Sequence, residues 1–93
     1  MNHVDIRFDP AKRAATLEHR GLDFADAALV FTGRTVTVQD MRREYGEDRF
    51  ITAGHLTGRC VVLVWTPRGG ARRVISMRHA HDEEEASWFG GLD

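Results

Sequence analysis

Residues 60–78 read CVVLVWTPRGGARRVISMR, and this stretch predicts the centre of the fold. Residues 60–65 are apolar without alternation, which is typical of a strand that is buried on both faces. Residues 67–70, Pro-Arg-Gly-Gly, are a strong turn signal, and residues 72–78 follow as a second strand. The stretch therefore predicts a β-hairpin made of a central strand and an arginine-rich neighbour.

Towards the N-terminus, the pattern predicts one strand and two helices. Residues 3–8 alternate between apolar and polar, as a half-buried strand does. Asp9-Pro10 then starts a helix that runs to about residue 19 and ends at Gly21. A second helix begins at Asp23, with Asp26 in the capping-box position, and ends at Gly33. This helix is expected to bury a stripe formed by Phe24, Ala27, Ala28 and Phe31.

The remaining segments complete an α+β pattern. Residues 34–39 and 47–56 read as strands, with a polar loop over residues 40–46, and residues 82–89 read as a helix that ends at Gly90-Gly91. The order is β-α-α-β-β-β-β-α. We expect a small antiparallel sheet with the two N-terminal helices on one face and a C-terminal helix, in one domain over residues 1–93.

Composition narrows the class of protein. No apolar run approaches the roughly 20 residues of a membrane span, and the N-terminus lacks an apolar signal core, so we expect a cytoplasmic protein without membrane contact. Cys60 is the sole cysteine; it cannot form an internal disulfide and is expected to be a small buried hydrophobe. Trp65 and Trp88 are expected to be core anchors, with platforms for base stacking as the alternative.

The charges are segregated along the chain. Twelve of the thirteen basic residues are arginine, and arginine grips phosphate or carboxylate with a planar fork. Four arginines and no acid lie between residues 68 and 78, whereas residues 82–85 are four consecutive acids. The sequence therefore predicts a basic working face beside an acidic element, although the net charge is only -1. The acids also suit the start of a helix.

The end of the last strand is the first candidate site. If Ile75 and Met77 point into the core, alternation places Val74 on the other side together with Arg72, Ser76 and Arg78. Arg78 would hold an RNA phosphate, and the adjacent His79 and His81 would move a proton. A solvated arginine edge with two surface histidines fits the same pattern.

A metal site at His79-x-His81, completed by Asp82 or Glu83, is a further alternative. The pair lacks the distant ligands of a usual zinc signature, so we predict no metal and no cofactor.

The second candidate site lies in residues 42–49. Tyr45, Glu47 and Arg49 offer a phenol for stacking, a carboxylate for base work and a guanidinium for phosphate. A simple cross-strand ion pair between Glu47 and Arg49 fits equally. The candidate substrate-binding residues are Arg72, Arg73, Tyr45 and Lys12, the last on the polar side of the first helix, where solvated charge is the ordinary interpretation.

Two long stretches resemble BrnT-family toxins. Residues 6–31, IRFDPAKRAATLEHRGLDFADAALVF, are similar to the start of that family, with its strand, Asp-Pro helix, Gly turn and Phe-x-x-Ala-x-x-x-Phe helix. Residues 44–85 resemble its Tyr-Gly-Glu-x-Arg strand, central apolar strand and Ile-Ser-x-Arg end. The resemblance covers residues 4–88. Positions 79 and 81 are histidine here, where many members of the family have Lys and Asn.

The resemblance implies a type II toxin with a RelE-like fold that cleaves RNA without metal and so inhibits translation. Its partner would be a BrnA-like ribbon-helix-helix antitoxin, and the complex would bind operator DNA through that antitoxin. Glu47, Arg49 and Arg78 match the family's charged positions, and Glu84 matches a glutamate of its last helix. We expect Arg49 and Arg78 to converge on one scissile phosphate, with Glu47 as base and His79 or His81 as acid. The alternative is a non-catalytic module that docks an acidic partner and serves in transcriptional autoregulation.

Overall fold

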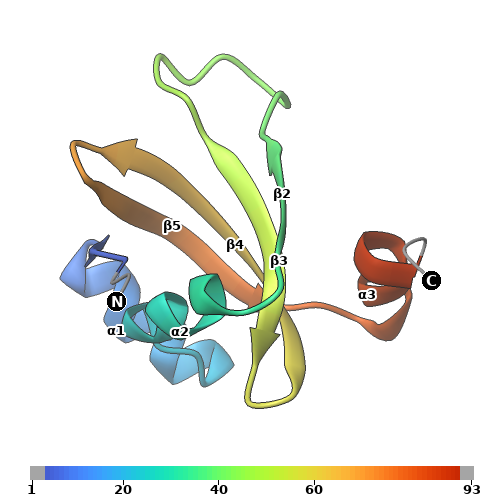
Figure 1. The fold of residues 1–93 in the computed structure, drawn as a ribbon. Coiled ribbons are helices and arrows are strands. Elements are labelled where there is room, and N and C mark those ends of the chain that lie inside the picture. Colours follow the sequence, from blue (N-terminus) through green and yellow to red (C-terminus); the bar gives the residue numbers. More distant parts are fainter. Residues whose placement is uncertain (1–3, 91–93) are drawn as a thin grey trace.

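A five-stranded mixed sheet forms the centre of the part of the chain, residues 4–90, that the computed structural model describes. Its strand order is β1-β5-β4-β3-β2 (Figure 1). The strands are β1 (Ile6–Arg7), β2 (Val36–Gln39), β3 (Phe50–Leu56), β4 (Arg59–Arg68) and β5 (Ala71–His79). The α+β class is confirmed, with the apolar stretch at residues 60–65 inside the central strand.

The first strand corrects the expectation of a purely antiparallel sheet. β2 to β5 are antiparallel neighbours, but β1 pairs with β5 in parallel, with Ile6 opposite Arg72. The helical segment carries the chain from one edge of the sheet to the other, so no hairpin sets the direction of β1. β1 is also shorter than the predicted strand, whose first residue, His3, lies outside the described residues.

The two N-terminal helices begin as the local signals predict. The Asp9 carboxylate accepts a hydrogen bond from Ala11 N at the start of α1 (Pro10–Arg20), and Gly21, with φ 68°, ends it. The second helix is split into a 3₁₀ turn, η1 (Phe24–Asp26), and α2 (Ala27–Thr32). The expected capping box is half formed: Asp23 accepts from Ala25 N, whereas Asp26 makes no side-chain capping bond to any described residue.

The two faces of the sheet are covered differently. α1, η1 and α2 pack on one face over a core formed by Leu22, Phe24, Ala27, Val30, Val61, Leu63, Trp65, Val74 and Met77. The C-terminal helix, α3 (Asp82–Phe89), lies across the sheet from them (Figure 1). It covers a smaller cluster of Ala53, Cys60, Val62 and Phe89, against which Trp88 packs. The burial of Trp65 and Cys60 confirms two of the predictions.

A β-bulge in β5 overturns the predicted alternation of the last strand. Ser76 pairs with Val64 and Val74 pairs with Trp65, so Ile75 is an extra residue without a partner in β4. The bulge shifts the side-chain parity by one residue. Val74 is consequently 1% exposed and lies in the same core cluster as Met77, not on the opposite face.

β3 begins at Phe50, three residues later than predicted. Phe50 packs against the core on the helical face, whereas Ile51 and Ala53 belong to the cluster under α3. Alternate residues of β3 therefore face the two layers of helices.

None of the helices in residues 4–90 has the length and apolar character that a membrane crossing requires.

Candidate functional site

Asp40, at the end of β2, organises the loop between β2 and β3. It is 4% exposed. Its carboxylate accepts from Arg42 Nε and Nη2, both at 2.7 Å, from Arg42 N at 3.2 Å and from the Tyr45 hydroxyl at 3.1 Å. The Arg42 guanidinium, assisted by Tyr45, holds the pKa of Asp40 well below its usual range. Asp40 N also donates to Arg49 O, so the loop is fixed at the start of β3.

The loop presents an aromatic ring to two guanidinium groups. Arg49 Cζ lies 4.1 Å from the centroid of the Tyr45 ring, and Arg43 Cζ lies 5.6 Å from it. These residues line a hollow of about 540 Å³, together with Arg42 and Glu44. An open, arginine-lined hollow with an aromatic ring suits a ligand that carries both phosphate and a flat base.

Glu47 joins this loop to the end of β4. Its Oε2 lies 3.5 Å from Arg49 Nε, and its Oε1 lies 3.0 Å from Arg68 Nη1. The alternative of an ion pair between Glu47 and Arg49 is therefore realised, but as part of a three-residue cluster. We call Arg43, Tyr45, Glu47, Arg49, Arg68 and Arg73 the arginine end of the sheet.

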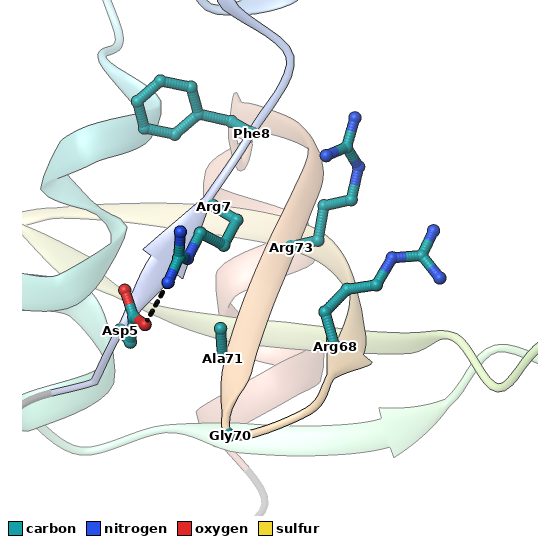
Figure 2. Close-up of a pocket in the computed structure, with 7 residues that line it drawn as sticks. All are labelled: Asp5, Arg7, Phe8, Arg68, Gly70, Ala71 and Arg73. Carbon is teal, nitrogen blue, oxygen red and sulfur yellow. Dashed lines mark hydrogen bonds and ion pairs between the residues drawn. The ribbon is translucent and has the colours of Figure 1, made fainter.

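Arg68 also borders a second hollow. Figure 2 shows Arg68 and Arg73 projecting to the same side of the β4–β5 hairpin, while Arg7 turns to Asp5, its ion-pair partner at 2.9 Å. This hollow has a volume of about 530 Å³. The cationic surface thus continues from Arg49 through Arg68 to Arg73, across three neighbouring strands.

Arg78 lies at the other end of β5 and is tied to α3. Its Nη1 and Nη2 donate to the two carboxylate oxygens of Glu84, each at 2.7 Å. This bidentate pair raises the pKa of Arg78 and lowers the pKa of Glu84. A hollow of about 680 Å³ adjoins the pair and is also lined by His81 and Glu83.

The structure does not bring Arg49 and Arg78 together at one phosphate. Arg49 precedes Phe50, which pairs with Trp65, whereas Arg78 pairs with Val62. The two residues are thus about 13 Å apart along the strands and about 10 Å apart across them. By alternation both lie on the sheet face away from α1, but each has its own glutamate partner. The expected convergence is wrong because the strand register separates the two arginines.

The two histidines stay near Arg78. His79 is half-buried, its Nδ1 has no hydrogen-bond partner among the described residues, and burial together with Arg59 lowers its pKa. His81 occupies the exposed N-cap position of α3. Within residues 4–90, neither histidine belongs to a group of three potential metal ligands. Neither lies at the arginine end.

Two predicted substrate-binding residues lie elsewhere. The Arg72 guanidinium stacks on the rings of Phe31 and Trp65, at 4.4 Å and 4.6 Å from their centroids, which places it on the helical face. The bulge is the reason, because it reverses the parity on which the prediction for Arg72 relied. Lys12 lies on α1, beside a hollow shared with His19 and Arg20.

Sequence reasoning missed Asp40 and Arg68 as parts of this site. The sequence predicts a polar loop at Asp40, although an aspartate at a strand end also signals a turn in which its side chain bonds the backbone two residues on. Arg68 lies inside the predicted Pro-Arg-Gly-Gly turn, and only the register of β3 with β4 shows that it reaches Glu47.

A small α+β domain whose open sheet end carries arginines around a tyrosine has the chemistry of a protein that binds an anionic chain. The comparison with protein families agrees with this class. Residues 8–84 match the family described as ribonuclease toxin, BrnT, of type II toxin–antitoxin system. This match covers most of the chain, and the chain belongs to the BrnT family. The family implies an RNA substrate and an antitoxin partner. No curated protein matches the sequence.

Proposed function

We propose that this BrnT-family protein is a metal-independent endoribonuclease that cleaves RNA at the arginine end of its sheet. Glu47 accepts the proton of a ribose 2′-hydroxyl, whose oxygen attacks the adjacent phosphorus while the bond to the 5′-oxygen breaks. The leaving oxygen takes a proton from solvent. The products carry a 2′,3′-cyclic phosphate and a 5′-hydroxyl.

The position of Glu47 between two guanidinium groups carries this proposal. Arg49 and Arg68 lie 3.5 Å and 3.0 Å from its two oxygens. A bound phosphate competes with Glu47 for both guanidinium groups, which frees the carboxylate beside the very linkage that it must deprotonate. The same two cations then stabilise the charge that develops on the phosphorus oxygens.

Tyr45 and the neighbouring arginines supply the binding surface. The Tyr45 ring is held in place by the hydrogen bond from its hydroxyl to Asp40, and it already accepts the Arg49 guanidinium on its face. An unstacked RNA base next to the scissile linkage has a flat partner there. Arg73, on the adjoining hollow, meets the neighbouring phosphate.

Arg78 has a different role in this proposal. Because both of its Nη atoms are engaged by Glu84, the pair is neutral and joins β5 to α3. We assign Arg78 as a positioning residue for α3 and not as a phosphate clamp. His79 and His81 flank this pair and take no part in proton transfer.

The biological setting follows from the family. Cleavage of cellular RNA would inhibit translation in the cytoplasm, and a ribbon-helix-helix antitoxin would neutralise the toxin and carry the complex to operator DNA. The cationic arginine end offers such a partner a surface for an acidic segment. Expression of the chain alone is then expected to arrest growth, and co-expression of the antitoxin to restore it.

The direct test is cleavage of RNA by the purified chain in EDTA, with analysis of the new ends. We expect a 2′,3′-cyclic phosphate, and about a 10²–10⁴-fold lower kcat for Glu47→Gln with RNA affinity retained. Arg59→Ala is the matched control, because Arg59 is exposed and lies about 20 Å along the sheet from the arginine end. Equal rates in Glu47→Gln and Arg59→Ala would contradict the assignment.

The non-catalytic alternative is favoured by one observation. Val38, Ile51 and Val64 are cross-strand neighbours in a row on the face that carries α3, and Val38 is 45% exposed. Such an apolar row suits a protein partner. Antitoxin binding without RNA cleavage, and without growth arrest on expression alone, would favour this second function.

A further inference from the structure

Three side chains of different chemistry meet where α3 packs on the β3–β4 hairpin. His55 comes from β3, Cys60 from β4 and Glu85 from α3, and one potential ligand atom of each lies within 4.8 Å of the other two. His55 Nε2 and Glu85 Oε2 are 2.9 Å apart. The cluster takes no part in the proposed cleavage, because it lies at the opposite end of β3 from Arg49.

The fold positions the first two of these residues firmly. His55 and Cys60 are directly opposite each other in the hairpin register. The hairpin closes at Thr57 and Gly58, both of which have positive φ, 52° and 79°. This two-residue turn is the tightest connection that antiparallel strands use, and it fixes the register of the pair. Positive φ is unusual for a β-branched threonine, which indicates that the flanking pairing dictates the turn.

The helix brings the third residue. Phe89 packs its ring 5.0 Å from the His55 ring and is buried in the cluster with Cys60. The Arg78–Glu84 pair anchors the residue next to Glu85. The packing of Phe89 and the Arg78–Glu84 ion pair therefore both hold the Glu85 carboxylate over the hairpin.

Thiolate, imidazole and carboxylate are the three ligand types of protein zinc sites. Tetrahedral coordination with bonds of about 2.0–2.3 Å places ligand atoms about 3.3–3.8 Å apart. Any separation near the 4.8 Å limit must therefore shorten, and the 2.9 Å between His55 and Glu85 must lengthen slightly. Side-chain exposures of 37% for His55 and 41% for Glu85 leave a path for the ion and a fourth position for water. A thiolate and a carboxylate together balance the charge of Zn²⁺.

We propose that His55, Cys60 and Glu85 form a zinc-binding site that ties α3 to the β3–β4 hairpin. The site is structural and separate from RNA cleavage, which needs no metal. α3 covers only one part of its sheet face. An ion at this position therefore strengthens the attachment of α3 to the sheet. The sequence pattern did not indicate this site, because His55 and Glu85 are 30 positions apart in the chain.

Cobalt provides the test, since Co²⁺ occupies zinc sites and reports its ligands by absorption. We expect the reduced, metal-free full-length chain to bind one Co²⁺ with visible bands of tetrahedral coordination and a near-ultraviolet thiolate charge-transfer band. One equivalent of Zn²⁺ should abolish both. Glu85→Gln and His55→Gln should each weaken binding at least about tenfold, the usual size of losing a metal-site interaction, and Cys60→Ala should remove the charge-transfer band.

Two control substitutions lie in or next to α3, the helix that carries Glu85. Glu83→Gln and His81→Gln should leave the cobalt spectrum and affinity unchanged, and the thermal midpoint should rise with Zn²⁺ in both, but not in Glu85→Gln. Absence of the thiolate band, or equal affinity in Glu85→Gln and Glu83→Gln, would overturn the proposal. RNA cleavage by the Glu85→Gln variant in EDTA is scored separately, so failure of the zinc site leaves the proposed function untouched.

Discussion

Asp40 shows how one buried residue fixes the arrangement of several surface side chains. A carboxylate buried at the end of β2 is stable only because Arg42 and Tyr45 satisfy it. The same bonds fix the backbone that carries Arg43, Tyr45 and Arg49. The stability of the loop and the geometry of the arginine end therefore depend on one ionised group.

The stabilisation from Asp40 is expected to disappear in acid. Its folded-state pKa is lowered by Arg42, so its contribution is fully present above the unfolded-state pKa of about 3.9 and is lost as the pH falls below that value. Urea unfolding at neutral and acidic pH should show Asp40→Asn less stable than the parent chain at pH 7, with the difference shrinking in acid. A difference that stays constant or grows as the pH falls would contradict this origin.

Among the elements, those fixed by neighbouring residues in the chain were predicted better than those fixed by contacts between distant segments. Asp9, Pro10 and Gly21 act within one turn of the chain, and α1 begins and ends where they predict. The parity of β5 failed because Ile75 is bulged, and a bulge depends on how two strands fit and leaves no local mark on alternation. Arg72 and Val74 were assigned to the wrong face for that reason alone.

The contact between α2 and β3 makes a prediction at the level of packing. A Cβ added to Gly54 would lie 2.6 Å from Val30 Cγ1 and 3.1 Å from Thr35 Cγ2. Val30 is completely buried and cannot move aside. Gly54→Ala should therefore destabilise the chain by about 1–3 kcal/mol, as overpacked cores do.

Gly70 is the matched control for this substitution. A Cβ there meets no described atom within 4 Å, and no positive φ is recorded for Gly70. Chemical denaturation should place Gly70→Ala close to the parent chain. Equal stability of the two alanine variants, or a lower stability of Gly70→Ala than of Gly54→Ala, would contradict the role of packing at Gly54.

For the whole molecule, the strand register decides which charges can act together. Tyr45, Glu47 and Arg49 can be predicted as one group because they are neighbours in the chain, and the structure keeps them together. The sequence also predicts that Arg78 joins this group, from its guanidinium and from the resemblance to the family, but the strand register separates them. Arg68, which completes the cluster, is 21 residues from Glu47 in the chain and reaches it through the β3–β4 pairing.

The two faces of the sheet also differ in what they carry. The face under α1 and α2 holds the larger core, whereas the other carries Arg49, Arg78 and α3. Because the larger core lies on one side, the other side is only partly covered, by α3. Under the proposed function, one end of this open face would cleave RNA, and the other attaches α3 through the Arg78–Glu84 pair.

The most direct test of this division compares kcat/KM for RNA cleavage in Arg49→Ala and Arg78→Ala under conditions where both variants are folded. If the scissile phosphate lies at the arginine end, Arg49→Ala should lose about 10²–10³-fold, the usual size of removing a cation or donor at a developing charge, and Arg78→Ala less than about tenfold. An equal loss in both variants, or a larger loss in Arg78→Ala, would place the scissile phosphate elsewhere and contradict the account.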